Sequence, residues 1–261
     1  MAFPAWTDLL TFVVILVIGV PLVYLFSKAV RLRTKPIEIA EKNKQAKLSL
    51  MVFLAVFAIA FAILAYYAYG WVRMTLTEDL IYVSRDTMWI IAILLPMAVV
   101  LKWTRQSLGS IGITRKDLNK NLALGFLLSA AFIAIIAFLA PSIGGGFTQF
   151  SVPMALSLVS FAIIGFGEET IFRGYIQTRL TAQIGTVTGI IIVAIIYAIF
   201  QFPVGYFCYN GDITSAVYYA LWRLSSGLVF GYVFQRSQNI IPSSIFHTLL
   251  VWGALLWGLY F

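Results

Sequence analysis

The sequence predicts an all-α protein, a polytopic membrane bundle with about eight transmembrane helices. The first observation is composition: of 261 residues, 61% are hydrophobic and 11% are charged, and the mean hydropathy is +0.95. A soluble domain has about 25% charged residues. The second observation is distribution, because the apolar residues are gathered in eight long stretches. These two features together predict an integral membrane protein.

Each stretch is close to the length of about 20 residues that a helix needs to cross the hydrocarbon core. The predicted spans are 8–29, 48–70, 87–103, 121–140, 152–168, 186–202, 214–235 and 240–261. The third, fifth and sixth are short, which indicates tilted or only partly lipid-exposed helices. The first lacks a basic leading region and a small-residue cleavage site, so we interpret it as a span and not as a signal peptide.

Lysine and arginine are concentrated in alternate connections, and this asymmetry predicts the orientation. The connections on the basic side, with the residues that follow spans five and seven, contain Lys28, Arg31, Arg33, Lys35, Lys42, Lys44, Lys47, Lys102, Arg105, Arg115, Lys116, Lys120, Arg173, Arg179 and Arg236. The other side has Arg73 and Arg85, accompanied by Glu78, Asp79 and Asp86. We therefore expect both termini on the non-cytoplasmic side. The net charge of +8 then reflects topology and anionic lipid headgroups, and we expect no nucleic acid partner.

The fifth span ends in two adjacent carboxylates, Glu168 and Glu169, followed by Arg173. Ionisable groups at membrane depth are costly, so their default interpretation is functional. Residues four apart share a helix face, so Glu169 is expected to meet Arg173 while Glu168 points about 100° away, into the bundle. Flanking glycines permit close helix approach: Gly165, Gly167 and Gly174. The spacing fits a general acid or base, and equally a charge cluster for helix packing or topology.

The sixth and seventh spans each contain polar residues that need partners. Tyr197 and Gln201 share one face, and a buried glutamine amide can hold a water or cap a neighbouring helix. Arg223 lies inside the seventh span, where Asp212 or a backbone carbonyl could bind it. The alternative for Arg223 is a side chain that extends outward to the interface.

His247, the only histidine, lies midway along the last span. It could donate a hydrogen bond to a developing oxyanion, or simply bond to another helix. A catalytic zinc usually takes three protein ligands. Because Cys208 is predicted on the opposite side, only Glu168, Glu169 and His247 remain, which is a poor set. We expect no metal and no other cofactor.

These residues, in this order, resemble the CAAX protease and bacteriocin-processing family, intramembrane glutamate-type endopeptidases that include the type II CAAX prenyl proteases. The resemblance covers about residues 105–255 and begins at 108–114. It divides a single membrane domain into N-terminal helices, 1–104, and a family-like core, 105–261. Its first motif is Glu168-Glu169-x-x-x-Arg173, its second falls at Tyr197-x-x-x-Gln201, and the run into its third is Gly227-x-x-x-Gly231, Arg236-Ser237, Pro242 and His247.

The resemblance implies that Glu168 activates a water, that Glu169 and Arg173 support it, and that His247 stabilises the oxyanion. Two positions depart from the family pattern, because Gln201 replaces a histidine and Val251 replaces an asparagine. Glutamine can bind a water but cannot take its proton at neutral pH, and valine offers no donor. Losing one oxyanion donor typically costs about 10²–10³ in rate.

Two functions follow. The first is a membrane-embedded endopeptidase, of impaired activity, which cleaves a peptide or protein substrate at the cytoplasmic membrane face. The alternative is a catalytically degenerate homologue that binds a membrane protein partner or has a structural role in a membrane complex. A transporter is a third class, but the inverted repeats typical of transporters are not visible. We expect a multi-pass protein surrounded by membrane lipids, and we favour the plasma membrane of a prokaryote over the endoplasmic reticulum.

Overall fold

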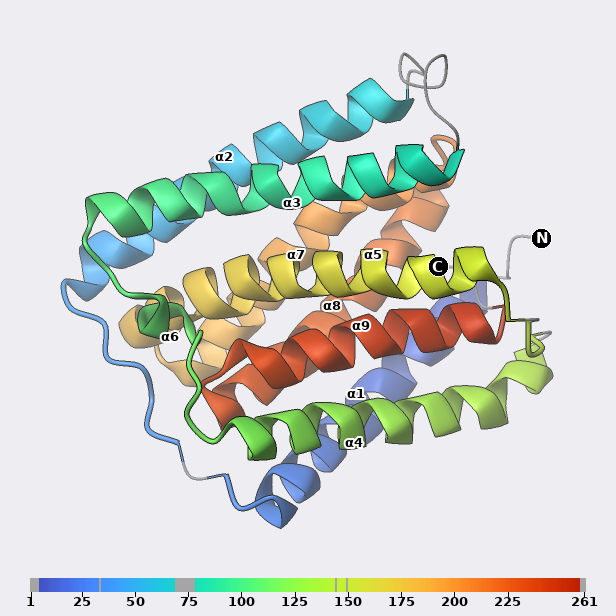
Figure 1. The fold of residues 1–261 in the computed structure, drawn as a ribbon, viewed down its shortest axis with the longest axis horizontal. Coiled ribbons are helices and arrows are strands. Elements are labelled where there is room, and N and C mark those ends of the chain that lie inside the picture. The colour runs from blue at the N-terminus through green and yellow to red at the C-terminus, as the bar shows by residue number, and fades with distance from the viewer. Residues whose placement is uncertain (1–4, 33, 69–77, 144, 149, 259–261) are drawn as a thin grey trace.

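The computed structural model describes residues 5–32, 34–68, 78–143, 145–148 and 150–258. In these ranges all regular structure is helical (Figure 1). The elements are α1 (Ala5–Ala29), α2 (Lys42–Ala68), α3 (Glu78–Trp103), η1 (Leu108–Ile111), α4 (Leu118–Leu139), η2 (Ala140–Ile143), α5 (Val152–Glu169), η3 (Thr170–Gln177), α6 (Thr178–Ile184), α7 (Thr186–Cys208), α8 (Ile213–Ser237) and α9 (Ile240–Leu256). Since α5, η3 and α6 are continuous, one long helical segment lies at each of the eight predicted spans, which confirms the predicted class.

Four helical segments within the described ranges are long and apolar enough to cross a membrane by themselves: Lys42–Tyr66, Leu118–Ser142, Val152–Ile184 and Thr186–Cys208. Three shorter apolar helices are Val13–Ala29, Thr87–Trp103 and Ile240–Leu256. The remaining long helix, α8, is less apolar because its inward face buries polar side chains such as Arg223, Ser225 and Ser226. These helices make the protein a multi-pass membrane protein, with outward apolar side chains in contact with lipid.

The helices alternate between two ends of the bundle (Figure 1). The connections from α1 to α2, α3 to α4, α6 to α7 and α8 to α9 all lie at the left-hand end of this view. In the middle, α5 and α9 lie side by side, α4 packs against α9, and α7 packs against α8. The end of the bundle at which these four connections lie is the one with the basic connections. The cytoplasmic location of that end stays a prediction, and Arg33 and Arg73, which contributed to it, lie outside the described residues.

The predicted end of the fifth span at residue 168 is wrong. The helix continues for another 16 residues to Ile184, through the π-helix η3, so the carboxylate pair lies near the middle of one long helix. Polar residues after the pair suggested an exit from the membrane, but every residue of η3 is buried. A π-helix of this kind is rare and often marks a functional site.

The same burial corrects the interpretation of Arg179 as a basic connection residue. Its side chain is fully buried, donates to the backbone oxygen of Ser110 at 3.0 Å, and contacts the Gln106 side chain. The carbonyl of Ile111 lies where a side chain on Gly174 would be, 2.5 Å from the position of a Cβ. The segment before α4 is therefore packed onto η3 and α6, and is more than a connector at the membrane surface.

Candidate active site

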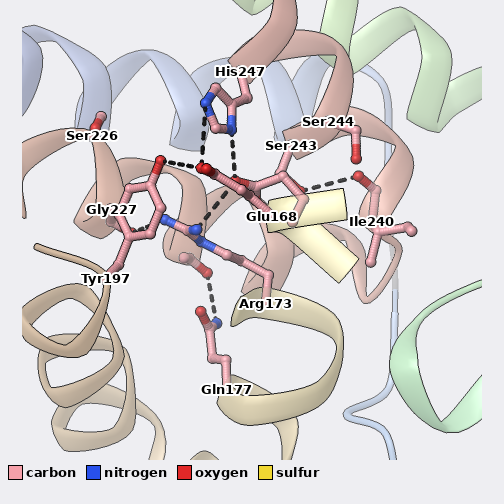
Figure 2. Close-up of polar contacts among 12 residues, drawn as sticks. Glu168, Arg173, Gln177, Tyr197, Ser226, Gly227, Ile240, Ser243, Ser244 and His247 are labelled. Carbon is pink, nitrogen blue, oxygen red and sulfur yellow. Dashed lines mark hydrogen bonds and ion pairs between the residues drawn. The ribbon is translucent and has the colours of Figure 1, made fainter. Parts of the chain in front are cut away.

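The predicted site residues meet where the junction of α5 and η3 contacts α7 and α9. Each is almost completely buried: Glu168 and His247 are 3% exposed, Gln201 is 2% exposed, and Glu169 and Arg173 are 0% exposed. Figure 2 shows the His247 ring directly above the Glu168 carboxylate, with Tyr197 and Arg173 beside it. Residues separated by up to 79 positions in the sequence are thus brought into one polar cluster within the bundle.

Three short hydrogen-bond contacts from α7 reach the Glu168 carboxylate. The Tyr197 hydroxyl donates to Oε2 at 2.8 Å, and the Gln201 amide nitrogen lies 2.9 Å from Oε2 and 3.0 Å from Oε1. Tyr197 and Gln201 can do this together because residues four apart lie on the same helix face. The expectation that Glu168 points into the bundle agrees with these contacts.

Glu169 lies on a different face and connects two other groups. Its Oε1 is 3.1 Å from Nη1 of Arg173, the contact expected from their spacing, and 3.2 Å from Nδ1 of His247. The Arg173 guanidinium also donates to the backbone oxygen of Gly227 at 3.3 Å and lies over the Tyr197 ring, 4.4 Å from its centroid. A buried charge needs such partners, since an unpaired one would be strongly destabilising.

The imidazole of His247 faces both carboxylates. Its Nδ1 contacts Glu169, and its Nε2 lies 4.0 Å from Oε2 of Glu168. The ring stacks on Phe230, with centroids 4.8 Å apart and planes at 22°, and meets the edge of Tyr197. Packing on two sides fixes the plane of the ring, so its nitrogens have defined partners.

Arg223 belongs to this cluster, and its role was missed in the sequence. Its Nη1 lies 3.4 Å from the Tyr197 hydroxyl and 3.4 Å from Nε2 of His247, and its Nη2 donates to the Tyr219 hydroxyl at 2.6 Å. Asp212, one of the two kinds of partner considered for Arg223, instead caps the start of α8 through Thr214 and Ser215, and Arg223 does not extend outward. An intramembrane cation was the available signal, but the sequence could not identify its partners.

Close helix contacts bring these side chains together. An added Cβ on Gly165 would lie 2.8 Å from Thr248 of α9, and one on Gly167 would lie 2.2 Å from Ile90 of α3. The predicted close approaches at the glycines beside the carboxylates are therefore present. The close approach at Gly165 lets α9, which carries His247, lie against the end of α5.

Two parallel hydrogen bonds join η3 to α8. Arg173 donates to the Gly227 carbonyl, and one turn later the Gln177 amide donates to the Gly231 carbonyl at 2.8 Å. Both bonds join residues 54 positions apart. The two glycines admit different neighbours, because an added Cβ on Gly231 would lie 2.9 Å from the Gln177 side chain and one on Gly227 would lie 3.2 Å from the Tyr197 ring.

Val251, at the expected asparagine position, is half-buried and packs against the apolar cluster formed mainly by α1, α4, α8 and α9. In the described part of the chain, no group of three or more histidine, cysteine, aspartate or glutamate side chains has an arrangement that could hold a metal ion. The expectation of no metal or other cofactor stays a prediction.

The cluster therefore has two carboxylates, two guanidinium groups, one imidazole, one phenol and one amide in a buried setting. Such an arrangement can hold a water beside a carboxylate and stabilise charge that develops next to it. Residues 149–253 match the family model described as Type II CAAX prenyl endopeptidase Rce1-like, and the matched segment contains every residue of the cluster. The search of curated proteins gives no match.

Proposed function

We propose that this chain, which belongs through residues 149–253 to the Type II CAAX prenyl endopeptidase Rce1-like family, is a membrane-embedded endopeptidase. It would cleave a peptide substrate at the cytoplasmic membrane face with a water activated by Glu168. The observation that carries the proposal is the approach of Glu168 and His247, whose Oε2 and Nε2 atoms lie 4.0 Å apart although they come from different helices.

In the proposed reaction, Glu168 takes a proton from the water as the water oxygen bonds to the carbonyl carbon of the scissile peptide. The carbonyl oxygen becomes an oxyanion, which nearby donors stabilise. When the oxyanion collapses, the carbon–nitrogen bond breaks and Glu168 returns the proton to the leaving amine. The products are a carboxylic acid and an amine, which ionise to a carboxylate and an ammonium group, with no net change in the enzyme.

The remaining residues have supporting roles. The Gln201 amide and the Tyr197 hydroxyl orient the Glu168 carboxylate through three contacts of 2.8–3.0 Å. Glu169 orients His247 through Nδ1, and Arg173 balances the Glu169 charge. Because Gln201 cannot accept a proton, the proton of the attacking water must pass to Glu168 or His247. We therefore propose that the enzyme is slower than one with a histidine at position 201.

The test uses the full-length protein reconstituted in lipid vesicles. Its substrates are a farnesylated peptide that ends in a CAAX-type sequence and the same peptide without the lipid, with products identified by mass spectrometry. We expect cleavage of at least one peptide, and its loss in Glu168→Gln. The matched control is Glu38→Gln, which removes a carboxylate from the connection between α1 and α2 and should leave the rate unchanged. If Glu168→Gln cleaves as fast as the parent, the mechanism is wrong.

A second candidate, a non-catalytic subunit of a membrane complex, is favoured by a specific observation. The Glu168 carboxylate is 3% exposed and already accepts hydrogen bonds from two side chains, so it serves as a structural acceptor without any reaction. In that case Glu168→Gln should retain binding to a membrane protein partner. Purification in a mild detergent would then return a complex of fixed stoichiometry, whereas a protein that purifies alone and cleaves peptides would reject this candidate.

A further inference from the structure

We propose that Arg223 is a positioning residue that, together with Glu169, holds His247 as the neutral tautomer with its proton on Nδ1. Nε2 then has a lone pair that accepts from Arg223. The inference rests on the proposed function for its catalytic consequence, but the tautomer itself follows from the hydrogen-bond partners alone.

The two ring nitrogens have partners of opposite kind. Nδ1 lies 3.2 Å from Oε1 of Glu169, and an ionised carboxylate can only accept a hydrogen bond. Nε2 lies 3.4 Å from Nη1 of Arg223, and a guanidinium can only donate. Both contacts are satisfied together when Nδ1 bears the proton and Nε2 does not. This is the only protonation state of His247 in which neither contact places two donors or two acceptors against each other.

The competing states have a specific defect. In the other tautomer, and in the imidazolium, Nε2 has a hydrogen that would face the Arg223 guanidinium. The nearest carboxylate oxygen on that side, Oε2 of Glu168, is 4.0 Å away, which is beyond hydrogen-bond distance. In the other tautomer, Nδ1 would also present its lone pair to the acceptor Glu169.

Arg223 can act in this way because its own position is fixed. It is nine-tenths buried, its Nη2 is hydrogen-bonded to Tyr219 at 2.6 Å, and its guanidinium lies 4.4 Å from the Trp222 ring centroid. Phe230 lies on the same helix and stacks on the imidazole. One helix, α8, therefore sets both the plane of the ring and the donor that faces Nε2.

In this state Nε2 has no hydrogen to donate, because its one lone pair accepts from Arg223. His247 is then not the oxyanion donor that the resemblance implies. Glu168, whose Oε2 lies 4.0 Å from Nε2, is left as the group that takes the proton of the attacking water.

The chain offers a direct test, because it has a single histidine. We would label histidine with ¹⁵N, use an affinity tag that contains no histidine, and record the imidazole nitrogen resonances of the full-length protein in lipid at neutral pH. We expect one pyrrole-type signal from protonated Nδ1 and one pyridine-type signal from Nε2, with the assignment made through ring carbon couplings. A protonated Nε2 in the parent protein would overturn the inference.

A set of variants distinguishes an effect of Arg223 on His247 from an effect of a general disturbance of α8. Arg223→Met should raise the fraction of Nε2-protonated histidine at least tenfold, and Arg223→Lys, which keeps a donor, should restore the parent signals. Tyr219→Phe, a milder change that loosens Arg223, should move the signals in the same direction as Arg223→Met. The matched control Arg236→Met removes another α8 arginine, which binds Ser27, and should change nothing at His247. Unchanged signals in both Arg223→Met and Tyr219→Phe would reject the role of Arg223.

This experiment does not depend on peptide cleavage. If the tautomer is as stated but no peptide is cleaved, the proposed function fails while the assignment of Arg223 stands. If peptides are cleaved through Glu168 but Nε2 is protonated, the proposed function stands and the role of Arg223 fails.

Discussion

The hydroxyl of Tyr197 lies 2.8 Å from Oε2 of Glu168, the carboxylate oxygen that also faces His247. The same hydroxyl is 3.4 Å from Arg223, so a donor from α8 can satisfy its lone pair while it donates to Glu168. An aromatic residue without a hydroxyl could not do this. In this chain the aromatic position of the second motif therefore contributes a polar group, next to a position where Gln201 replaces the expected histidine.

That replacement gives a prediction about rate. Gln201→His introduces a titratable group within reach of Glu168, and general acid–base catalysis of this kind contributes about 10²–10⁴ when fully effective. We expect the rate of peptide cleavage in lipid vesicles to rise at least about tenfold. Gln201→Asn, which keeps an amide but shortens the side chain, is the control and should lower the rate. No gain in Gln201→His would show that proton transfer is not what limits this protein.

The buried pair of Glu169 and Arg173 gives a prediction about stability. Glu169→Gln or Arg173→Met alone leaves an uncompensated charge in the bundle, which should cost about 3–5 kcal/mol of unfolding free energy. The double variant should cost at least about 2 kcal/mol less than the sum of the two, because no lone charge remains. Unfolding by added sodium dodecyl sulfate in mixed micelles provides the measurement. Additive costs would mean that the 3.1 Å contact has no energetic coupling.

Two glycines beside the carboxylates should respond differently to alanine. A Cβ on Gly174 would lie 2.5 Å from the backbone oxygen of Ile111, whereas one on Gly167 meets the flexible end of the Ile90 side chain. Gly174→Ala should therefore destabilise the protein by about 1–3 kcal/mol, and Gly167→Ala by less. Gly146→Ala is the control in the same unfolding assay, because nothing lies within 4 Å of its added Cβ and the change introduces no steric conflict. Equal costs at 167 and 174 would contradict the close packing of η1 on η3.

The orientation in the membrane can be tested with the single cysteine. Cys208 is exposed at the end of α7, at the end of the bundle opposite the basic connections. We expect a membrane-impermeant maleimide to label it from the non-cytoplasmic side of intact cells. In a Cys208→Ala background, Ser107→Cys introduces a thiol at the start of η1 and should be labelled only after the membrane is permeabilised. The reverse pattern would invert the predicted topology.

The fold was largely predictable because long apolar stretches have few alternatives in a bilayer. Predicted and observed boundaries agree to within three residues at both ends of some spans, such as 121–140 against α4 at Leu118–Leu139, whereas α3 begins at Glu78, nine residues before its predicted span. The failure was at residues 168–184. The low hydropathy of Thr170, Arg173 and Gln177 predicts that the span ends before them. Hydropathy alone cannot distinguish a polar helix face that is buried in the protein from one that is exposed to water.

The site was predictable only in part, for a similar reason. Helix periodicity indicated that Glu169 meets Arg173 and that Tyr197 and Gln201 share one face. It could not give the distance of Arg223 from His247, because that contact depends on how α8 is rotated against α9. The stacking of Phe230 on the imidazole is equally a product of packing between helices, which one sequence does not encode in any local pattern.

The hydrogen bonds from Arg173 and Gln177 to Gly227 and Gly231 constrain how a substrate could enter. They have the same spacing in both partners, so a small slide or rotation of α8 relative to η3 would break both together. When a peptide enters, we expect η3 and α8 to keep their position relative to each other. A crosslink between η3 and α8 should therefore be tolerated by a working protein.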